Sequence, residues 1–330
     1  MQDYNTILKR LQVKKNSGLM LAASYWRLGK IELAGLVAEC GTFIGIQEGV
    51  GIVEANFCKQ RLCPSCAWRR SVKIYGGTSH ILDYLDEKYG KDIKYLFLTL
   101  TVKNVFLEDL GKAIDDMAEA FKRLINNKAW KRRVKGAMRT LEITVNYEKR
   151  TAHPHYHLIL AVDRSYATKG DKTYWTQEDW QRVWQKAARL DYAPQVYIER
   201  IKAKKKVRDA CKTKEERERA DRRAAVAEVS KYIAKDADYL IDSRDAQMDP
   251  DVAERLTDYL VEQLFEQLRG RRLVSYTGIL REAQRDLKID PEAGELVDEM
   301  RDDINQVIRR YHWAAGLGRY VPGRRGEGMR

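Results

Sequence analysis

Residues 151–162 read Thr-Ala-His-Pro-His-Tyr-His-Leu-Ile-Leu-Ala-Val, and the part from His155 to Val162 predicts a β-strand. Successive side chains of a strand point to opposite faces, so His155 and His157 project from one face while Tyr156 projects from the other. Two imidazoles at this spacing can bind one metal ion, each through one ring nitrogen. The chain has five histidines and three of them lie in this stretch, so we expect a metal site here.

A third ligand is expected from the preceding strand. Residues 138–145, Met-Arg-Thr-Leu-Glu-Ile-Thr-Val, alternate as a strand should, and residues 146–154 have the composition of a hairpin loop. In such a hairpin Glu142 and Thr144 lie across from the histidine pair, and the apolar neighbours of Glu142 favour a deep position on the sheet. Two histidines and one carboxylate leave positions for substrate oxygens, and we predict that they hold Mn²⁺ or Mg²⁺. His153 is a third imidazole ligand, a group behind the ligands, or the end of the loop.

A second chemical motif lies on a predicted helix over residues 224–241, which includes the segment Glu-Val-Ser-Lys-Tyr. Apolar residues recur along one side of this helix. Successive residues of a helix are about 100° apart around its axis, so a carboxylate, two phenols and an ammonium lie along one edge of the helix, next to the apolar stripe. These residues are Glu228, Tyr232, Lys235 and Tyr239. The competing interpretation is an ordinary solvated helix surface, where the same residue types are common.

These side chains can carry out phosphodiester chemistry. The Tyr232 phenolate can attack a phosphorus that a metal ion polarises, which releases a 3′-hydroxyl and forms a 5′-phosphotyrosine. Lys235 or Lys231 can favour the phenolate and balance charge on the phosphate. Glu228 can act as a general base in a later step. Tyr239 lies two turns further on, near the same face. A mechanism in which both tyrosines act as nucleophiles therefore stays open, and we rank it below the mechanism in which Glu228 assists the later step.

The order of predicted elements indicates an α+β fold with helices packed on a largely antiparallel sheet. The first 35 residues, residues 67–90 and most of the last 90 residues read as helical. Residues 203–223 are almost all charged, which is typical of a solvated helical face or a mobile loop. From residue 95 onward we expect a strand at 95–102, a helix at 107–134, the two hairpin strands, a helix at 176–190, a short strand at 196–198 and the helix at 224–241.

Four of the five cysteines fall between residues 40 and 66. Cys63-Pro-Ser-Cys66 has the spacing of a zinc knuckle, and Cys40 and Cys58 would complete a Cys₄ site. Cys40 and Cys58 are further apart than the cysteines of a standard knuckle, and the alternative is a set of free buried thiols. We predict structural zinc at these four residues and assign no role to Cys211.

Composition bounds the class of protein and its partners. The 330 residues carry a net charge of +13, which suits a polyanionic partner, because phosphate contacts release counterions. No stretch approaches the roughly 20 apolar residues of a membrane span, and no secretory signal is visible at the N-terminus. We therefore expect a cytoplasmic protein that has no membrane partner and binds nucleic acid.

The two chemical motifs together resemble those of the HUH-type rolling-circle replication initiators (Rep proteins) of small Gram-positive bacterial plasmids. In that family a strand like Phe97–Thr101 comes first and a strand like Leu141–Thr144 follows. A histidine motif like His153–Leu158 comes next, and a helix with Glu-x-x-x-Tyr comes last, as in Glu228–Tyr232. The resemblance covers about residues 40–240. A further short segment, residues 275–280, also looks like part of that family.

The resemblance implies an HUH endonuclease fold and a site-specific nickase and strand transferase. Such an initiator binds the double-strand origin and nicks one strand in a melted or extruded hairpin loop. Tyr232 then carries the 5′ end, and the free 3′-hydroxyl primes the host polymerase, with a host helicase as a further partner. In the subfamily with one tyrosine and a nearby glutamate, Glu228 assists the cleavage that terminates replication.

We accordingly predict three regions. Residues 1–92 form an N-terminal Cys-rich module stabilised by zinc, residues 93–245 form the HUH endonuclease domain, and residues 246–330 form a helical C-terminal region. Two alternatives stay open, an HUH transposase or relaxase and a zinc-containing DNA-binding regulator without catalysis. Relaxases usually place the nucleophile ahead of the histidines, whereas Tyr232 follows them.

Overall fold

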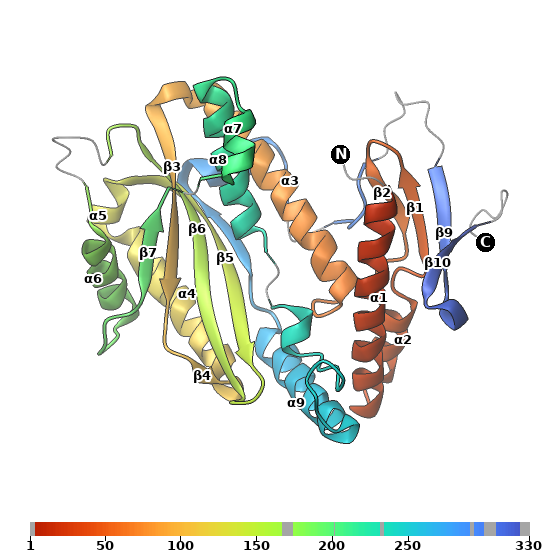
Figure 1. Cartoon of the computed structure of the whole chain (residues 1–330). Helices are drawn as coiled ribbons and strands as arrows, with labels where there is room; N and C mark the ends of the chain where they lie inside the picture. The colour runs from red at the N-terminus through yellow and green to blue at the C-terminus, as the bar shows by residue number, and fades with distance from the viewer. Residues whose placement is uncertain are drawn as a thin grey trace. The chain divides into compact units, whose positions relative to one another are not determined.

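The computed structural model describes residues 4–166, 174–200, 202–231, 234–290, 294–299 and 308–323. The chain forms two compact units, each assembled from separated segments (Figure 1). Unit 1 comprises residues 1–70, 236–265 and 294–330, and unit 2 comprises residues 71–235 and 266–293. The sequence suggested three consecutive regions instead, because pairing between strands far apart in the chain leaves no local signal.

Unit 2 is built on a six-stranded sheet in the order β7-β3-β6-β5-β8, with β4 paired to β6 off this path. All of its pairings are antiparallel, so the predicted α+β class with a largely antiparallel sheet is confirmed. The strands are β3 (Ile93–Thr101), β4 (Val105–Phe106), β5 (Val134–Asn146), β6 (Thr151–Asp163), β7 (Val196–Glu199) and β8 (Val274–Thr277). The two long central strands, β5 and β6, form the predicted hairpin, but β6 starts earlier than predicted and the loop is only residues 147–150.

One face of this sheet is covered by α4 (Leu110–Asn126), with α5 (Lys128–Lys131) and α6 (Gln177–Ala188) beside it. Phe121 of α4 makes an edge-on ring contact with Tyr156 of β6, with 6.0 Å between centroids. The helix predicted at 107–134 includes α4, whose apolar side is buried here, at Leu110, Ile114, Met117, Phe121 and Leu124. The side of β6 opposite to the histidines therefore faces the main core of unit 2.

The histidine face of the sheet is covered in part by α3 (Pro64–Tyr89) and α8 (Lys214–Val229). Tyr95 of β3 points to this face, and its hydroxyl donates a hydrogen bond to Asp86 of α3 at 3.2 Å. Arg222 of α8 forms an ion pair with the same carboxylate at 2.6 Å. These contacts place α8 on the face that carries His155 and His157.

A sharp turn connects β8 to α10 (Gly278–Asp286) in unit 2. Gly278 has a φ of +54°, and a Cβ built there would lie 2.0 Å from the carbonyl oxygen of Lys135. Only glycine fits a left-handed backbone that approaches another strand so closely. This close approach lets β8 pair with β5 at the edge of the sheet.

The predicted helix at 224–241 is wrong in its second half, because α8 ends at Val229. The Ser230 hydroxyl donates to the Val226 carbonyl oxygen at 2.7 Å, a side-chain bond that competes with helix continuation. A single 3₁₀ turn, η3, follows at Asp236–Asp238. The charged run at 203–223 forms α7 (Lys205–Ala210) and the first part of α8, in agreement with the interpretation as a solvated helical face.

Unit 1 contains a four-stranded antiparallel sheet in the order β10-β9-β1-β2. Its elements are α1 (Tyr4–Arg27), α2 (Ile31–Glu39), β1 (Phe43–Gln47), β2 (Gly51–Ala55), β9 (Ile308–Ala314), β10 (Arg319–Pro322) and most of α9 (Pro250–Leu268). The last 90 residues were predicted to be mostly helical, but they also contain the strands β8, β9 and β10. These strands join sheets whose other strands come from earlier in the chain. Among the described residues, no helix is both long enough and apolar enough to cross a membrane.

Candidate active site

Glu142, His155 and His157 converge on the face of the β5–β6 hairpin that α3 and α8 cover in part. The register pairs Glu142 with His155 and Thr140 with His157, so all three ligand candidates share one face. Oε2 of Glu142 lies 3.0 Å from Nε2 of His157 and 3.7 Å from Nε2 of His155. The side chains are 11% to 17% exposed, which leaves the site reachable from solvent. The structure thus brings together the three residues that the sequence predicted as metal ligands.

Hydrogen bonds behind the imidazoles orient them toward the carboxylate. Nδ1 of His155 donates to the carbonyl oxygen of His153 at 3.1 Å. Nδ1 of His157 lies 3.1 Å from the hydroxyl oxygen of Thr99 on β3. In the absence of a metal ion, Nε2 of each histidine faces Glu142. With a proton kept on Nδ1, an Nε2 that gives up its proton has a lone pair for a metal ion, which is the arrangement that metal-binding histidines commonly have. This role of Thr99 was not predicted, although its polar side chain in an apolar strand was an available signal.

The pKa of Glu142 also favours metal binding. Burial opposes ionisation of this carboxyl group, but hydrogen bonds from His155 and His157 outweigh burial and hold its pKa well below the ordinary value. The group is therefore a carboxylate at neutral pH.

The donor set fits a divalent cation. The ligand atoms of the three residues lie within 4.8 Å of one another. Two ligands that are each about 2.1 Å from a metal lie about 3 Å apart when the angle between them is near 90°. Two imidazoles and a carboxylate suit first-row divalent metals such as Mn²⁺, and three residues leave coordination positions for phosphate oxygens.

His153 lies on the same face of β6, and its ring stacks on that of His155 with 5.3 Å between centroids. Burial, and after it the neighbouring His155, lowers the pKa of His153, so this imidazole is neutral at pH 7. Its ring nitrogens are not part of the three-residue cluster. Three roles were left open for His153. Its backbone carbonyl oxygen accepts a hydrogen bond from the His155 ring, which supports the role of a group that orients a ligand from behind.

The end of α8, which carries Glu228, lies over the same face of the sheet. Glu218 of α8 is paired with Arg164, just beyond the end of β6, at 3.7 Å, and α8 runs along β6 in the opposite direction (Figure 1). From Glu218 to Val229 the helix rises about 16 Å at about 1.5 Å per residue. His157 is about 20 Å from the end of β6 at about 3.3 Å per residue. The chain that follows Val229 therefore leaves the helix near the level of the histidines.

Of the residues in this motif, Glu228 and Lys231 form an ion pair with each other. Lys231 and Lys235 lie beyond the end of α8, and Lys235 is exposed. Tyr232 lies outside the described residues. The predicted shared helix edge for these side chains is thus wrong from residue 230 onward, although Glu228 occupies the last turn of α8.

Tyr239 does not share an edge with Glu228. It follows η3 in unit 1, is 2% exposed, and donates a hydrogen bond from its hydroxyl to the Leu62 carbonyl oxygen at 2.7 Å. Burial raises the pKa of its phenol well above the ordinary value. A buried phenol with its proton committed to a carbonyl is a packing residue, so the two-tyrosine scheme with Tyr239 is overturned.

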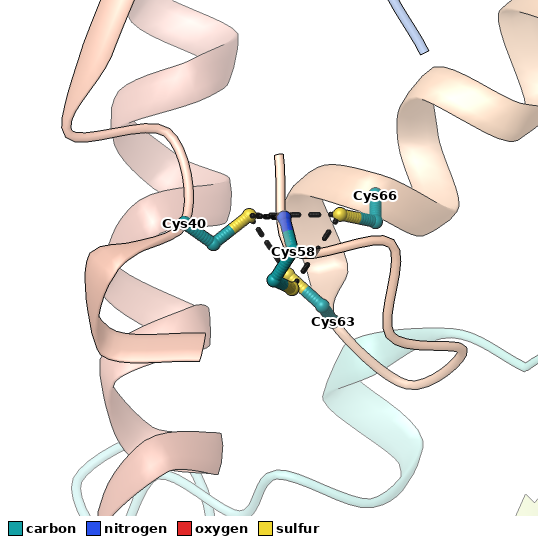
Figure 2. Close-up of side chains that lie close together, drawn as sticks. All are labelled: Cys40, Cys58, Cys63 and Cys66. Carbon is teal, nitrogen blue, oxygen red and sulfur yellow. Dashed lines mark hydrogen bonds between the residues drawn. The ribbon is translucent and has the colours of Figure 1, made fainter. Parts of the chain in front are cut away.

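Unit 1 holds the other group of candidate ligands. The sulfur atoms of Cys40, Cys58, Cys63 and Cys66 point toward a common centre (Figure 2) and lie within 4.8 Å of one another. Cys40 Sγ is 3.5 Å from the sulfurs of Cys63 and Cys66. Sulfur ligands about 2.3 Å from a tetrahedral zinc ion are about 3.8 Å apart, so the four thiols fit that ion. The predicted Cys₄ cluster is present.

The β1–β2 hairpin explains why the wide spacing between Cys40 and Cys58 does not prevent a cluster. Its base is closed by a hydrogen bond from the Gly41 amide to the Asn56 carbonyl oxygen at 3.1 Å. The Lys59 amide donates to Cys66 Sγ at 3.2 Å. Hydrogen bonds led by that of Cys40 lower the pKa of the Cys63 thiol, whereas hydrogen bonds within the cluster raise the pKa of Cys40 and Cys66. Cys63 is therefore the thiolate of the cluster, and zinc binding would release the protons of the other thiols.

We expect Cys63→Ser to remove bound zinc and to lower the thermal unfolding midpoint by about 10 °C or more. A structural zinc ion contributes folding free energy directly, and several kcal/mol correspond to such a shift in a protein of this size. The measurement is metal content by mass spectrometry together with thermal denaturation. Cys211→Ser is the matched control, because the Cys211 thiol donates to the Val207 carbonyl oxygen and is not part of the four-cysteine cluster. Equal metal content in both variants would contradict the zinc assignment.

Comparison with known proteins finds one family over most of the chain. A family model described as "Replication protein" matches residues 50–321. A "Protein rep" of Bacillus amyloliquefaciens is 38% identical over 280 residues, covering 82% of this chain and 77% of that protein. A "Protein rep" of Bacillus sp is 39% identical over 269 residues, covering 81% and 83%. One from Streptococcus pneumoniae serotype 2 is 32% identical over 290 residues, covering 86% and 82%. No solved structure matches this chain.

Proposed function

Because the chain belongs to the Rep family of replication proteins, we propose that it initiates rolling-circle replication by nicking one strand of a plasmid's double-strand origin. The observation that supports nicking most directly is the convergence of Glu142, His155 and His157 on one open sheet face. The chain that leaves α8 beside that face carries the one phenol of the Glu-x-x-x-Tyr segment, Tyr232.

In this proposal the three ligands of unit 2 hold a divalent cation, Mn²⁺ or Mg²⁺. When bound, such a cation supplies Lewis-acid polarisation of the scissile phosphate. His155 and His157 present Nε2 to it while Thr99 and the His153 carbonyl keep their rings in place. Glu142 contributes a negative charge that offsets part of the charge of the cation.

Tyr232 is the nucleophile of the proposed step. Its phenolate oxygen forms a bond to phosphorus, and the bond from phosphorus to the 3′-oxygen breaks. The tyrosine proton goes to solvent or a base, and the leaving 3′-oxygen takes up a proton to become a hydroxyl. The 5′-phosphotyrosine keeps the energy of the phosphodiester, and the 3′-hydroxyl is a primer for a host polymerase working with a host helicase.

Glu228 is proposed to assist the later cleavage, and Lys231 and Lys235 to balance charge near Tyr232. Glu228→Ala should leave the initial nick within a fewfold of wild type but slow the release of covalently bound DNA by about 100-fold, the typical size of general-base catalysis. The measurement follows nicked product and adduct separately over time. Glu282→Ala is the control, because Glu282 is an exposed acid on another helix of unit 2, α10. Loss of the initial nick in Glu228→Ala would contradict the assignment.

The test of the function is nicking of supercoiled plasmid DNA. The purified full chain is incubated with a plasmid that carries its origin, and with the same plasmid without the origin, in Mn²⁺ or in EDTA. We expect open circular product only with origin and metal together. Binding to the origin without any nicking would instead support a DNA-binding regulator.

A further inference from the structure

An exposed tyrosine lies beside the metal site on the edge of the sheet. In the register of β3, Thr99 pairs with His157 on one side and with Tyr197 of β7 on the other. Directly paired residues of neighbouring strands point to the same face, so Tyr197 shares the face of the metal ligands. Two strand spacings place its Cα about 10 Å from that of His157. The side chain is 51% exposed, so its ring is accessible to a ligand.

The rest of β7 shows that this exposure is confined to one face. Val196 is buried and Ile198 half-buried on the opposite face, where α6 covers the strand. Val196 and Ile198 are therefore sufficient to attach β7 to the core. The exposed Tyr197 ring adds nothing to that attachment.

Positive charge lies at both ends of β7. Before the strand, the Lys103 ammonium lies 4.0 Å from the ring centroid of Tyr192, and the Lys103 amide donates to the Tyr192 hydroxyl at 2.8 Å. Lys103 follows Thr101, the partner of His155 in the sheet. This cation therefore lies at the histidine end of β3.

After the strand comes a lysine segment, defined as Lys202, Lys204, Lys205 and Lys206, all of them exposed. The segment is held in place, because the Ala203 amide donates to Asp221 of α8 at 2.7 Å and Arg208 pairs with the same carboxylate at 3.3 Å. Within the described part of the chain, none of the four lysines forms an ion pair. Arg208 and the α8 arginines Arg219, Arg222 and Arg223 are paired with acids. The lysine segment therefore leaves an excess of positive charge.

We propose that β7 and the lysine segment bind the single-stranded DNA that flanks the scissile phosphate, with Tyr197 stacking on a base. An aromatic platform between cations is the arrangement by which proteins hold single strands without reading sequence. The proximity of Tyr197 to the metal ligands places that base within a few nucleotides of the phosphate to be cleaved. The inference rests on the proposed nicking function, and it gives the course that the DNA strand takes across the protein surface, which we call the strand path.

The test is binding of the full chain to a fluorescein-labelled oligo(dT) 20-mer in buffer without added Mn²⁺ or Mg²⁺ and without a chelator, measured by anisotropy at several salt concentrations. Tyr197→Ala should weaken binding about tenfold, whereas Tyr197→Trp, which keeps a stacking surface, should stay within about twofold of wild type. Tyr174→Ala is the matched control, because that tyrosine is 48% exposed and packs on Tyr166 instead.

A second pair of variants tests the lysines. Replacing Lys204, Lys205 and Lys206 by alanine should reduce the slope of log affinity against log salt by about 2, at about 0.7 per lost phosphate contact. The control removes the same charge from the other side of the sheet, at Lys122, Lys128 and Lys131 of α4 and α5. It should leave the slope nearly unchanged.

The outcomes separate this inference from the function on which it rests. Equal binding by Tyr197→Ala and Tyr174→Ala, or equal slopes for the two lysine variants, would overturn the strand path while wild-type nicking stands. Failure of the wild type both to bind the oligonucleotide and to nick origin plasmid would overturn both proposals.

Discussion

His157→Ala is expected to lower the rate of metal-dependent nicking by about a thousandfold or more. The variant loses one of two imidazole ligands and leaves the Glu142 carboxylate without its 3.0 Å partner. Lewis-acid stabilisation of a phosphoryl transition state contributes several kcal/mol, and about 4 kcal/mol corresponds to a thousandfold in rate. Duplex origin binding should be unchanged, because the substitution lies in the metal site of unit 2.

The measurement is the initial rate of nicking against Mn²⁺ concentration, with metal affinity determined by titration calorimetry. His80→Ala is the control, since His80 is an exposed histidine of α3 outside the three-residue cluster. A wild-type rate in His157→Ala at saturating Mn²⁺ would show that the Glu142–His155–His157 cluster does not carry the catalytic metal.

Tyr232→Phe has the second large expected effect, complete loss of nicking and of covalent DNA attachment. Phenylalanine has no oxygen to form the bond to phosphorus, and no other group of the proposed step replaces it. Binding of Mn²⁺ and of origin DNA should persist, since the ring remains. The measurement is a denaturing gel of labelled single-stranded origin DNA after incubation with Mn²⁺.

Tyr239→Phe is the informative control for that experiment. It should nick at the wild-type rate but unfold more easily, by about 1–3 kcal/mol, because the buried Leu62 carbonyl oxygen loses its hydrogen-bond donor. Nicking by Tyr232→Phe together with loss of nicking in Tyr239→Phe would reverse the two roles.

The metal ligands were predictable because a strand has a period of two residues. His155 and His157 had to share a face of β6, and a short hairpin connection had to bring Glu142 of β5 opposite to them. The groups behind the ligands were harder to predict. Thr99 reaches His157 from β3, and pairing between β3 and β6 is a long-range property that the local pattern does not specify.

The end of α8 could not be predicted from spacing. Apolar residues continue at helical intervals past Val229 to Leu240, and no Gly or Pro marks a stop. Ser230 ends the helix through a bond to Val226, and the residues from Asp236 join unit 1, where Tyr239 is buried. Tyr239 and Leu240 are thus buried in unit 1 and do not continue the apolar face of α8.

Pairing between strands that are far apart in the chain accounts for the remaining differences between the predicted and the observed structure. Cys40 and Cys58 meet because β1 and β2 form a hairpin between them, which their separation in sequence concealed. The strands β9 and β10 carry many charged and aromatic residues and have little apolar alternation, and they are strands because they extend the β1 edge. Local patterns identified the chemistry of both sites, while tertiary contacts determined which segments surround them.

The central claim is that a metal-dependent attack by Tyr232 produces the nick. The most direct measurement incubates the full chain with a labelled single-stranded oligonucleotide that carries the origin loop, in Mn²⁺ or in EDTA, and maps the covalent adduct by peptide mass spectrometry. We expect an adduct on the peptide that contains Tyr232 in Mn²⁺ and none in EDTA. An adduct on any other residue, or nicking without an adduct, would contradict this claim.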